Sequence, residues 1–168
     1  MISISEAKKL PEMLVLKKFV ENNPGHIKQN VYDHSLKTLK AMRRLSRNKF
    51  MRLVALVHDV GKAKTMEKNG SQISYPNHDK AGTRIIASLN LGLPRKQHSL
   101  AVRMVGNHLI AFYSKNFVVE IRRKSRGFAR EQMLLAIADL KGGDEYRISP
   151  RGFNRKLKLF KQALREVS

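Results

Sequence analysis

Residues 49–60 constrain the fold most, because they are apolar on nearly every side and end close to the adjacent pair His58 and Asp59. An apolar surface of this kind predicts a central helix that other elements bury. A histidine and a carboxylate at its end are costly to bury unless each has a partner. Gly61 follows at the position where a left-handed C-cap residue is expected. The rest of the chain must therefore supply partners for His58 and Asp59.

Apolar residues at steps of three and four predict further helices along most of the chain. The predicted helices cover residues 5–22, 27–46, 49–60, 78–90, 94–110, 115–124, 129–141 and 151–167. Pro11 limits the first helix or marks its late start. Asn77 can cap the helix over 78–90, and Pro94 opens the helix over 94–110. Residues 21–26 read as a break, and the polar segment 62–76 has room for a short hairpin. We therefore expect an all-α fold, a compact helical bundle forming one domain over residues 1–168.

The composition limits the class of protein. A chain of 168 residues with 42% hydrophobic residues is expected to bury one substantial core. The absence of cysteine excludes disulfides, iron–sulfur clusters and thiolate zinc sites. No apolar run is long enough to span a bilayer, and the N-terminus lacks the core of a signal peptide. The expected location is the cytoplasm.

Six ionisable side chains that can bind metals face the predicted interior. They are His34, His58, Asp59, His78, His108 and Asp139. A single inward histidine is more often a hydrogen-bonded core residue than a ligand. Six such groups without an internal counter-charge are better explained by a metal site, because divalent cations require neutral imidazoles and carboxylates. His26 lies in the predicted break and His98 on a polar helix face, so both are predicted to be surface residues.

The same residues suggest a reaction. Asp59 has two carboxylate oxygens and could bridge two ions, which would generate hydroxide near neutral pH and clamp phosphate oxygens. Lys62 follows closely and could neutralise charge developing on a phosphate. The alternative for Lys62 is an exposed lysine favoured by the dipole at a helix C-terminus. Asp59 and Lys62 are therefore the catalytic candidates. The expected cofactors are one or two divalent transition metal ions, with Mn, Fe, Co, Ni and Zn all open.

The motifs "YDHSLKTL", "LVHDVGK", "YPNHDKAG", "VGNH" and "AIADL" resemble, in this order, the HD superfamily of metal-dependent phosphohydrolases. "HDVGKAKT" followed by "YPNHDKAG" is most similar to the HD domain of bacterial CCA-adding tRNA nucleotidyltransferases. The resemblance covers about residues 28–143. It implies that His34, His58, Asp59 and Asp139 bind one metal, and that His78 and His108 bind a second, with Asp59 bridging. The printed sequence contains no nucleotidyltransferase head, so nucleotide addition is not expected.

The charge bears on the partner. Thirty-four Lys and Arg against 13 Asp and Glu give a net charge of +21, which favours nucleic acid first and an anionic membrane surface second. The alternative is a basic surface without a specific partner. The predicted C-terminal helix, about 150–167, should dock its apolar stripe and turn a basic face outward. Candidate phosphate or nucleic-acid contacts are Lys62, Arg84, Arg122, Arg123, Lys124, Arg151, Arg155 and Lys158. Tyr113, Phe128 and Phe153 are candidates for base stacking, with core packing as the alternative.

Two classes of function follow. The first is a metal-dependent phosphohydrolase acting on nucleotides or RNA ends, of the 2′,3′-cyclic phosphodiesterase, nucleotidase or phosphatase type, with a metal-dependent RNA or DNA nuclease as its main variant. The second is a non-catalytic nucleic-acid-binding module with a structural metal site. The complete set of six ligands favours the enzyme, and the resemblance favours RNA or a tRNA-like molecule over DNA.

Overall fold

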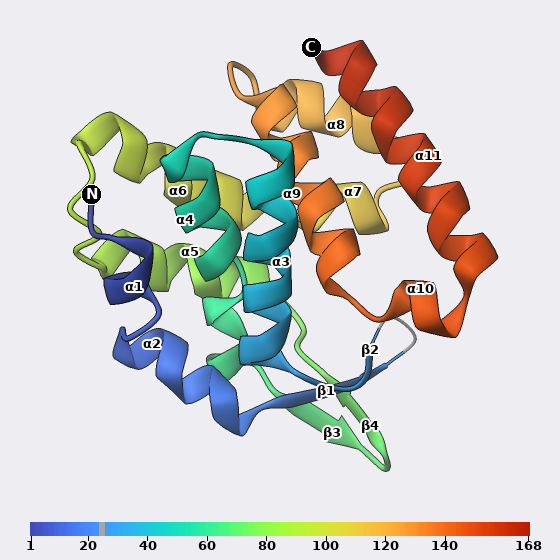
Figure 1. The fold of residues 1–168 in the computed structure, drawn as a ribbon, viewed down its shortest axis with the longest axis horizontal. Coiled ribbons are helices and arrows are strands. Elements are labelled where there is room, and N and C mark those ends of the chain that lie inside the picture. The colour runs from blue at the N-terminus through green and yellow to red at the C-terminus, as the bar shows by residue number, and fades with distance from the viewer. Residues whose placement is uncertain (24–25) are drawn as a thin grey trace.

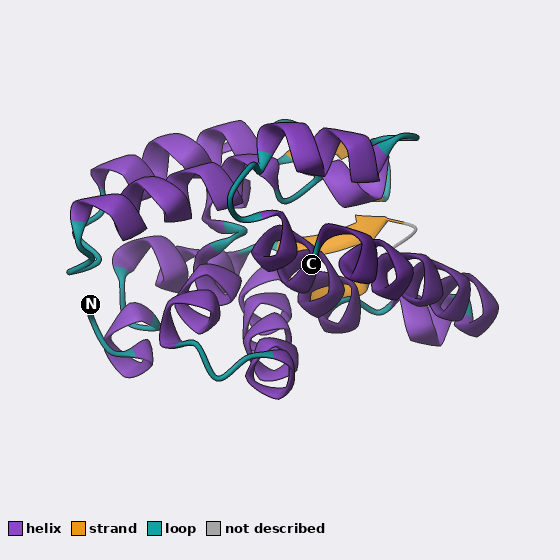
Figure 2. Ribbon diagram, turned by 90° about the horizontal axis from the view of Figure 1, so that it is seen from above, coloured by secondary structure: helices purple, strands orange, loops and turns teal. Residues whose placement is uncertain are grey.

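The computed structural model describes residues 1–23 and 26–168, which fold mainly into helices with a small sheet at one side (Figure 1, Figure 2). The helices of this described part are α1 (Ile4–Ala7), α2 (Pro11–Leu14), α3 (Val31–Leu45), α4 (Lys49–Val57), α5 (His78–Ser88), α6 (Arg95–Asn107), α7 (Ile110–Tyr113), α8 (Phe117–Lys124), α9 (Ala129–Gly142), α10 (Glu145–Ile148) and α11 (Pro150–Val167). Two 3-10 helices are η1 (Val15–Lys18) and η2 (Val60–Lys64). The strands are β1 (Val20–Asn23), β2 (His26–Asn30), β3 (Glu67–Asn69) and β4 (Gln72–Ser74).

Helices α3, α4 and α9 form the centre of the fold, where α3 runs beside α9 (Figure 1). The prediction of a buried helix is confirmed for α4, whose side chains from Leu53 to Val57 are all buried. Polar residues set where these helices begin. Asn30 accepts hydrogen bonds from the first turn of α3, and Asn48 accepts one from the backbone of Phe50 in α4. The two caps therefore fix the first residues of α3 and α4.

Helix α11 packs against α9 and α8 at the outside of the molecule (Figure 1). Phe160 and Ala163 of α11 are buried, and Phe160 lies against Phe112 and Phe117. Ser149 accepts a hydrogen bond from the backbone of Gly152, and Pro150 occupies the first turn, where its missing N–H is not needed. The helix therefore docks through one apolar stripe.

The sheet is antiparallel with the strand order β2-β1-β4-β3. The hairpin predicted for the 62–76 segment is confirmed as β3 and β4. Strands β1 and β2 were not predicted, so the all-α prediction holds as a mostly helical fold with a small sheet added. The predicted break at 21–26 is occupied by these two strands in its described part, while residues 24–25 lie outside the described residues.

Two helix boundaries were wrong. The predicted helix over 5–22 is replaced by α1, α2 and η1, because Pro11 cannot continue a helix and instead opens α2. The helix predicted from residue 27 begins at Val31, because Asn30 acts as its cap. The short helices α7 and α10 were not predicted. None of the helices in the described part of the chain combines the length and the apolar character needed to cross a membrane.

Gly61 was predicted to be a left-handed C-cap, and this was wrong, because it lies within η2 and not among the glycines with positive φ. Its role is close approach. A Cβ atom at Gly61 would lie 2.0 Å from the carbonyl oxygen of His78 and 2.4 Å from the backbone nitrogen of Gly82. Gly82 also permits a close approach, since a Cβ there would lie 2.9 Å from Val105 Cγ1. These glycines let η2 and α6 press against α5.

Candidate metal centre

The end of α4 and the start of α5 meet at the centre of the site. His58 is the C-cap residue of α4 and Asp59 follows it, and both are buried. His78 is the first residue of α5, and the absence of a side chain at Gly61 lets the His78 backbone lie against this segment. His108 follows the last turn of α6. The packing of helices therefore brings three histidines to one carboxylate.

All six predicted metal ligands converge, and they divide into two groups around Asp59. Asp59 Oδ2 lies 3.4 Å from His34 Nε2 and 3.3 Å from His58 Nε2. Asp59 Oδ1 lies 3.2 Å from His78 Nε2 and 3.6 Å from His108 Nε2. Each oxygen of this carboxylate thus faces one pair of histidines, an arrangement suited to a bridging ligand.

Asp139 belongs to the first of these groups. Its Oδ1 lies 2.9 Å from His34 Nε2 and 3.4 Å from His58 Nε2. Asp139 comes from α9 and His34 from α3, so the central pair of helices supplies both. The imidazoles of His34 and His58 thus lie within 3.4 Å of the carboxylate oxygens of Asp59 and Asp139. Two imidazoles and two carboxylates form a donor set that suits a divalent transition metal.

Hydrogen bonds orient three of the histidine rings. The Nδ1 atoms of His58, His78 and His108 lie 3.0, 2.6 and 2.6 Å from the carbonyl oxygens of the residues three positions earlier. Each Nδ1 therefore donates its proton to the backbone, which leaves Nε2 directed at the site as the atom that can bind a metal. His78 Nε2 and His108 Nε2 are only 3.1 Å apart. Two lone pairs repel at this distance unless a cation lies between them, so these residues fit a metal ion.

Charges in the site stabilise one another. Burial alone lowers the pKa of His58, but the negative charges of Asp59 and Asp139 outweigh it and raise that pKa to about 9. Burial raises the pKa of the Asp59 carboxyl, yet His58 and Lys62 hold that pKa well below its ordinary value. The pKa of Asp139 is lowered in the same way by His58 and His34. In the absence of metal a proton on His58 compensates the carboxylates.

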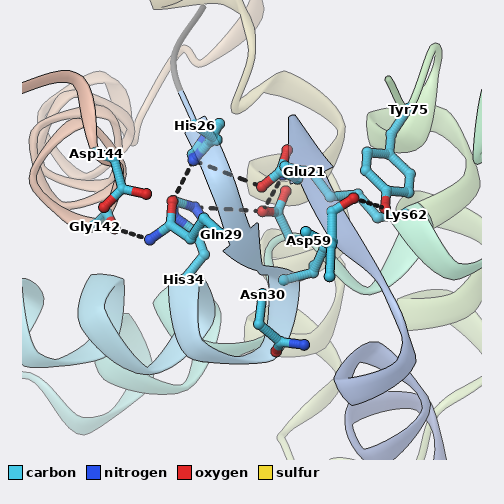
Figure 3. Close-up of polar contacts among 12 residues, drawn as sticks. Glu21, His26, Gln29, Asn30, His34, Asp59, Lys62, Tyr75, Gly142 and Asp144 are labelled. Carbon is cyan, nitrogen blue, oxygen red and sulfur yellow. Dashed lines mark hydrogen bonds and ion pairs between the residues drawn. The ribbon is translucent and has the colours of Figure 1, made fainter. Parts of the chain in front are cut away.

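Lys62 is buried, with 4% of its surface exposed, so its alternative reading as an exposed lysine is wrong. Its Nζ donates to Asp59 Oδ2 at 2.7 Å and to Glu21 Oε1 at 2.8 Å. Figure 3 shows the side chains of Glu21, Asp59 and Lys62 directed toward one another. Burial alone lowers the pKa of Lys62, but the negative charges of Asp59 and Glu21 outweigh burial and raise this pKa above its ordinary value. The Lys62 side chain therefore stays charged. Lys62 thus holds Asp59 in place.

Sequence reasoning missed Glu21, Gln29 and the position of His26. His26 was predicted to be a surface residue but is partly buried, and its ring packs edge-on against His34 with 4.9 Å between the ring centroids. Gln29 accepts from His26 and donates to the Gly142 carbonyl at 2.8 Å (Figure 3). These residues come from β1 and β2, whose short segments carry no apolar alternation, so no signal in the sequence marked them.

A cavity of about 380 Å³ opens above the predicted ligands. Asp59, His78, His108 and Asp139 line it, and α10 and α11 contribute Glu145 and Lys156 to the same lining. Lys156 Nζ lies 2.9 Å from Glu145 Oε2. The donor groups are therefore accessible to a small ligand, in contrast to the closed coordination of structural zinc sites.

The predicted phosphate contacts other than Lys62 lie on the surface. The exposed residues are Arg84, Arg122, Arg123, Lys124, Arg151, Arg155 and Lys158. Lys124 pairs with Glu120 at 3.1 Å and lines a second cavity. Of the predicted stacking residues, Phe128 is buried in the core and Phe153 packs against Tyr146, whereas Tyr113 is 80% exposed. Lys156, which was not among the predicted contacts, is the basic residue of α11 that reaches the first cavity.

Comparison with protein-family models matches the family described as HD domain over residues 31–140, about two thirds of the chain. The chain belongs to the HD domain family. The predicted order of histidines and aspartates agrees with this assignment, and HD domains are metal-dependent hydrolases. This HD domain is therefore a metal-dependent phosphohydrolase that binds divalent metal.

Curated relatives include proteins named "Multifunctional CCA protein" from Legionella pneumophila. The protein of strain Lens is 33% identical over 132 residues, which is 74% of this chain and 31% of the relative. The protein of strain Paris is 32% identical over the same share of both chains. This chain therefore spans about a third of the length of these relatives.

Proposed function

We propose that this HD domain hydrolyses phosphoesters of nucleotides or RNA ends, with 2′,3′-cyclic and terminal phosphates as its substrates. The observation that carries the proposal is the position of Asp59. Its two oxygens face two pairs of histidines at the wall of an accessible cavity. A purely structural site would need neither the second pair nor the cavity, so the non-catalytic alternative is disfavoured.

The predicted ligands support two ions rather than one. His34 and His58 lie near one oxygen of Asp59 and near Asp139 Oδ1, and His78 with His108 approach the other Asp59 oxygen. Divalent ions, when bound, polarise phosphoryl oxygens and lower the pKa of water. The work of the chain is to fix these ligands, and it does so through the backbone hydrogen bonds to Nδ1 and through Lys62.

Positive side chains near the cavity would bind the phosphate. Lys62 lines the cavity but is held by two carboxylates, so we assign it to the orientation and ionisation of Asp59 as much as to the substrate. Lys156 is paired with a single carboxylate and also lines the cavity. A phosphate in this cavity would gain from both charges.

The net charge of +21 supports a polymeric substrate, and the exposed basic residues of α11 support a nucleic acid as that polymer. Because α11 also lines the cavity through Lys156, a strand bound along its basic face would bring one end to the metal centre. The name of the relatives is consistent with a substrate related to tRNA. A nuclease would use the same groups on internal phosphodiesters.

The test is incubation with 2′,3′-cyclic nucleotides and with end-labelled RNA and DNA. Opening of the cyclic ester or release of terminal phosphate, without shortening of the strand, is expected. The His58→Ala, Asp59→Ala double variant should lose activity, whereas His98→Ala should keep it, because the His98 ring bonds the Ile86 carbonyl, which lies outside the site. Internal cleavage with cyclic esters untouched would instead establish the nuclease.

A further inference from the structure

A second cavity of about 570 Å³ adjoins the first. The two cavities share four lining residues, which are Tyr75, His78, Leu109 and Tyr113. His78 is among the predicted metal ligands, so a molecule with one group at the metals has room to continue into the second cavity. Its volume lies in the range of small-ligand sites.

Tyr113 lies on the boundary between the cavities, at the end of α7. Its side chain is 80% exposed, more than that of Tyr146 at 57%. The neighbouring Phe112 shows the contrast, since it packs against Phe160 in the core. The ring of Tyr113 is thus available to a ligand in either cavity, and a flat aromatic surface stacks well on the face of a nucleobase.

Asn77 supplies a polar group in the second cavity. It occupies the N-cap position of α5, where an asparagine side chain ordinarily accepts a backbone hydrogen bond, yet it makes none within the described part of the chain. Its backbone also adopts a left-handed conformation with φ of 55°. Because the Asn77 amide is exposed, caps no helix among the described residues and lies beside His78 in the cavity lining, it is available to a ligand. Strained backbone of this kind is concentrated at functional sites.

Asn107 provides a second amide group on the wall of this cavity. Its Nδ2 donates to the Lys124 carbonyl and to Ser125 Oγ, both at 3.3 Å. These bonds fix the side chain, and its Oδ1 accepts no hydrogen bond from the described residues. The rim carries both signs of charge, because Asp79 and Glu120 lie there with Lys80 and Lys124. The cavity therefore offers an aromatic face and amides rather than a strong positive field.

We propose that the second cavity binds the nucleoside whose phosphate lies at the metal centre, with the base stacked on Tyr113 and its polar edge facing Asn77 and Asn107. This inference rests on the proposed function, because it takes the reacting phosphate to be at the metals. It assigns Tyr113 and Asn77 as residues that select nucleotides over other phosphoesters.

The test compares two substrates that share a five-membered cyclic phosphate. Adenosine 2′,3′-cyclic phosphate carries a nucleoside, and glycerol 1,2-cyclic phosphate does not. In the Mn²⁺-loaded protein, Tyr113→Ala is expected to raise KM for the adenosine ester by about 5- to 100-fold, the effect of one lost stacking contact. The effect on the glycerol ester should be much smaller. Tyr113→Phe should restore the wild-type KM, because stacking needs only the ring.

Two further variants sharpen the test. Asn77→Gly keeps a residue that accepts the left-handed backbone while removing the amide, and it is expected to raise KM for the adenosine ester several-fold. Tyr146→Ala removes another exposed tyrosine that lies outside both cavities, so it should change neither KM. Equal effects of Tyr113→Ala on both esters, or none, would overturn the proposal while leaving the hydrolase intact.

A binding measurement separates this inference from the proposed function. If the wild-type protein hydrolyses neither ester, the proposed function fails, and calorimetric titration with adenosine 3′-monophosphate still decides the subsite. Weaker binding to Tyr113→Ala than to Tyr113→Phe, by a similar factor, supports it. Equal affinity for both variants, or no binding to the wild-type protein, overturns it.

Discussion

Replacement of Gly61 by alanine tests how packing creates the metal centre. The new Cβ would lie 2.0 Å from the carbonyl oxygen of His78, whereas carbon and oxygen ordinarily approach to about 3.3 Å. It would also lie 2.4 Å from the backbone nitrogen of Gly82. Both contacts are with backbone, so side-chain rotation cannot relieve them. The start of α5 must move away from η2 by roughly 1 Å.

This displacement has two measurable consequences. Overpacking of this kind costs about 1–3 kcal/mol, and we expect the upper end, near 3 kcal/mol, which lowers the melting temperature by roughly 6–12 °C in a chain of this size. The separation of His78 Nε2 from Asp59 Oδ1, now 3.2 Å, should also increase. Metal ligands tolerate changes of only about 0.2 Å, so the site at His78 and His108 should lose its ion.

The assay combines thermal unfolding of the metal-free protein, followed by circular dichroism, with metal content per chain. Gly70→Ala is the matched control, because Gly70 has φ of 58° but nothing within 4 Å of a new Cβ. Its cost, about 1–2 kcal/mol, comes from the backbone alone and should leave the metal content unchanged. A Gly61→Ala protein with wild-type metal content, and no larger loss of stability than Gly70→Ala, would refute the reasoning.

Three further predictions concern the ligands and the basic surface. Asp59→Asn should lower the affinity for both ions, whereas Asp139→Asn should weaken only one, as metal content per chain will show; equal losses in the two variants contradict a bridging Asp59. Because the proton on His58 is held with a raised pKa of about 9, metal must displace it, so metal affinity should rise about tenfold per pH unit up to about pH 9 and then level off. Calorimetry in buffers of different ionisation enthalpy should detect the release of this proton. A metal affinity that is independent of pH between 7 and 9 would show that metal displaces no proton from His58. RNA affinity should fall steeply with salt, and Arg151→Glu with Arg155→Glu should lower both the affinity and the salt dependence at constant metal content; an affinity unaffected by salt argues against a nucleic-acid surface.

The sequence predicted which candidate metal ligands face the interior, because helical periodicity reports which face of a helix is buried. His34, His108 and Asp139 each lie on an apolar stripe, so their inward direction follows from spacing alone. The same logic failed for Glu21 and His26, because they lie on short strands whose burial depends on what the helices place above them. Glu21 is buried because Lys62 binds it, and that contact spans a separation of 41 residues that no local pattern records.

The exposure of Tyr113 and the position of Lys156 were likewise beyond local patterns. Helical spacing predicted the apolar stripe by which α11 docks, but not which of its basic residues reaches the cavity. That choice depends on how far α11 is rotated and shifted along α9. It is set by the packing of Phe160 against Phe112 and Phe117, three residues from separate elements.

The balance of buried charge indicates how the centre would fill. Asp59, Asp139 and Glu21 are held ionised by their surroundings, and Lys62 and His58 are held protonated, which leaves one net negative charge in the metal-free interior. One divalent ion that displaces the proton on His58 makes this interior neutral. A second ion would leave two uncompensated positive charges in a buried site, which is unfavourable unless an anion accompanies it. The second ion should therefore bind more tightly in the presence of inorganic phosphate, and titration with Mn²⁺ followed by electron paramagnetic resonance can measure this. Two ions binding with equal affinity in the absence of any anion would contradict the argument.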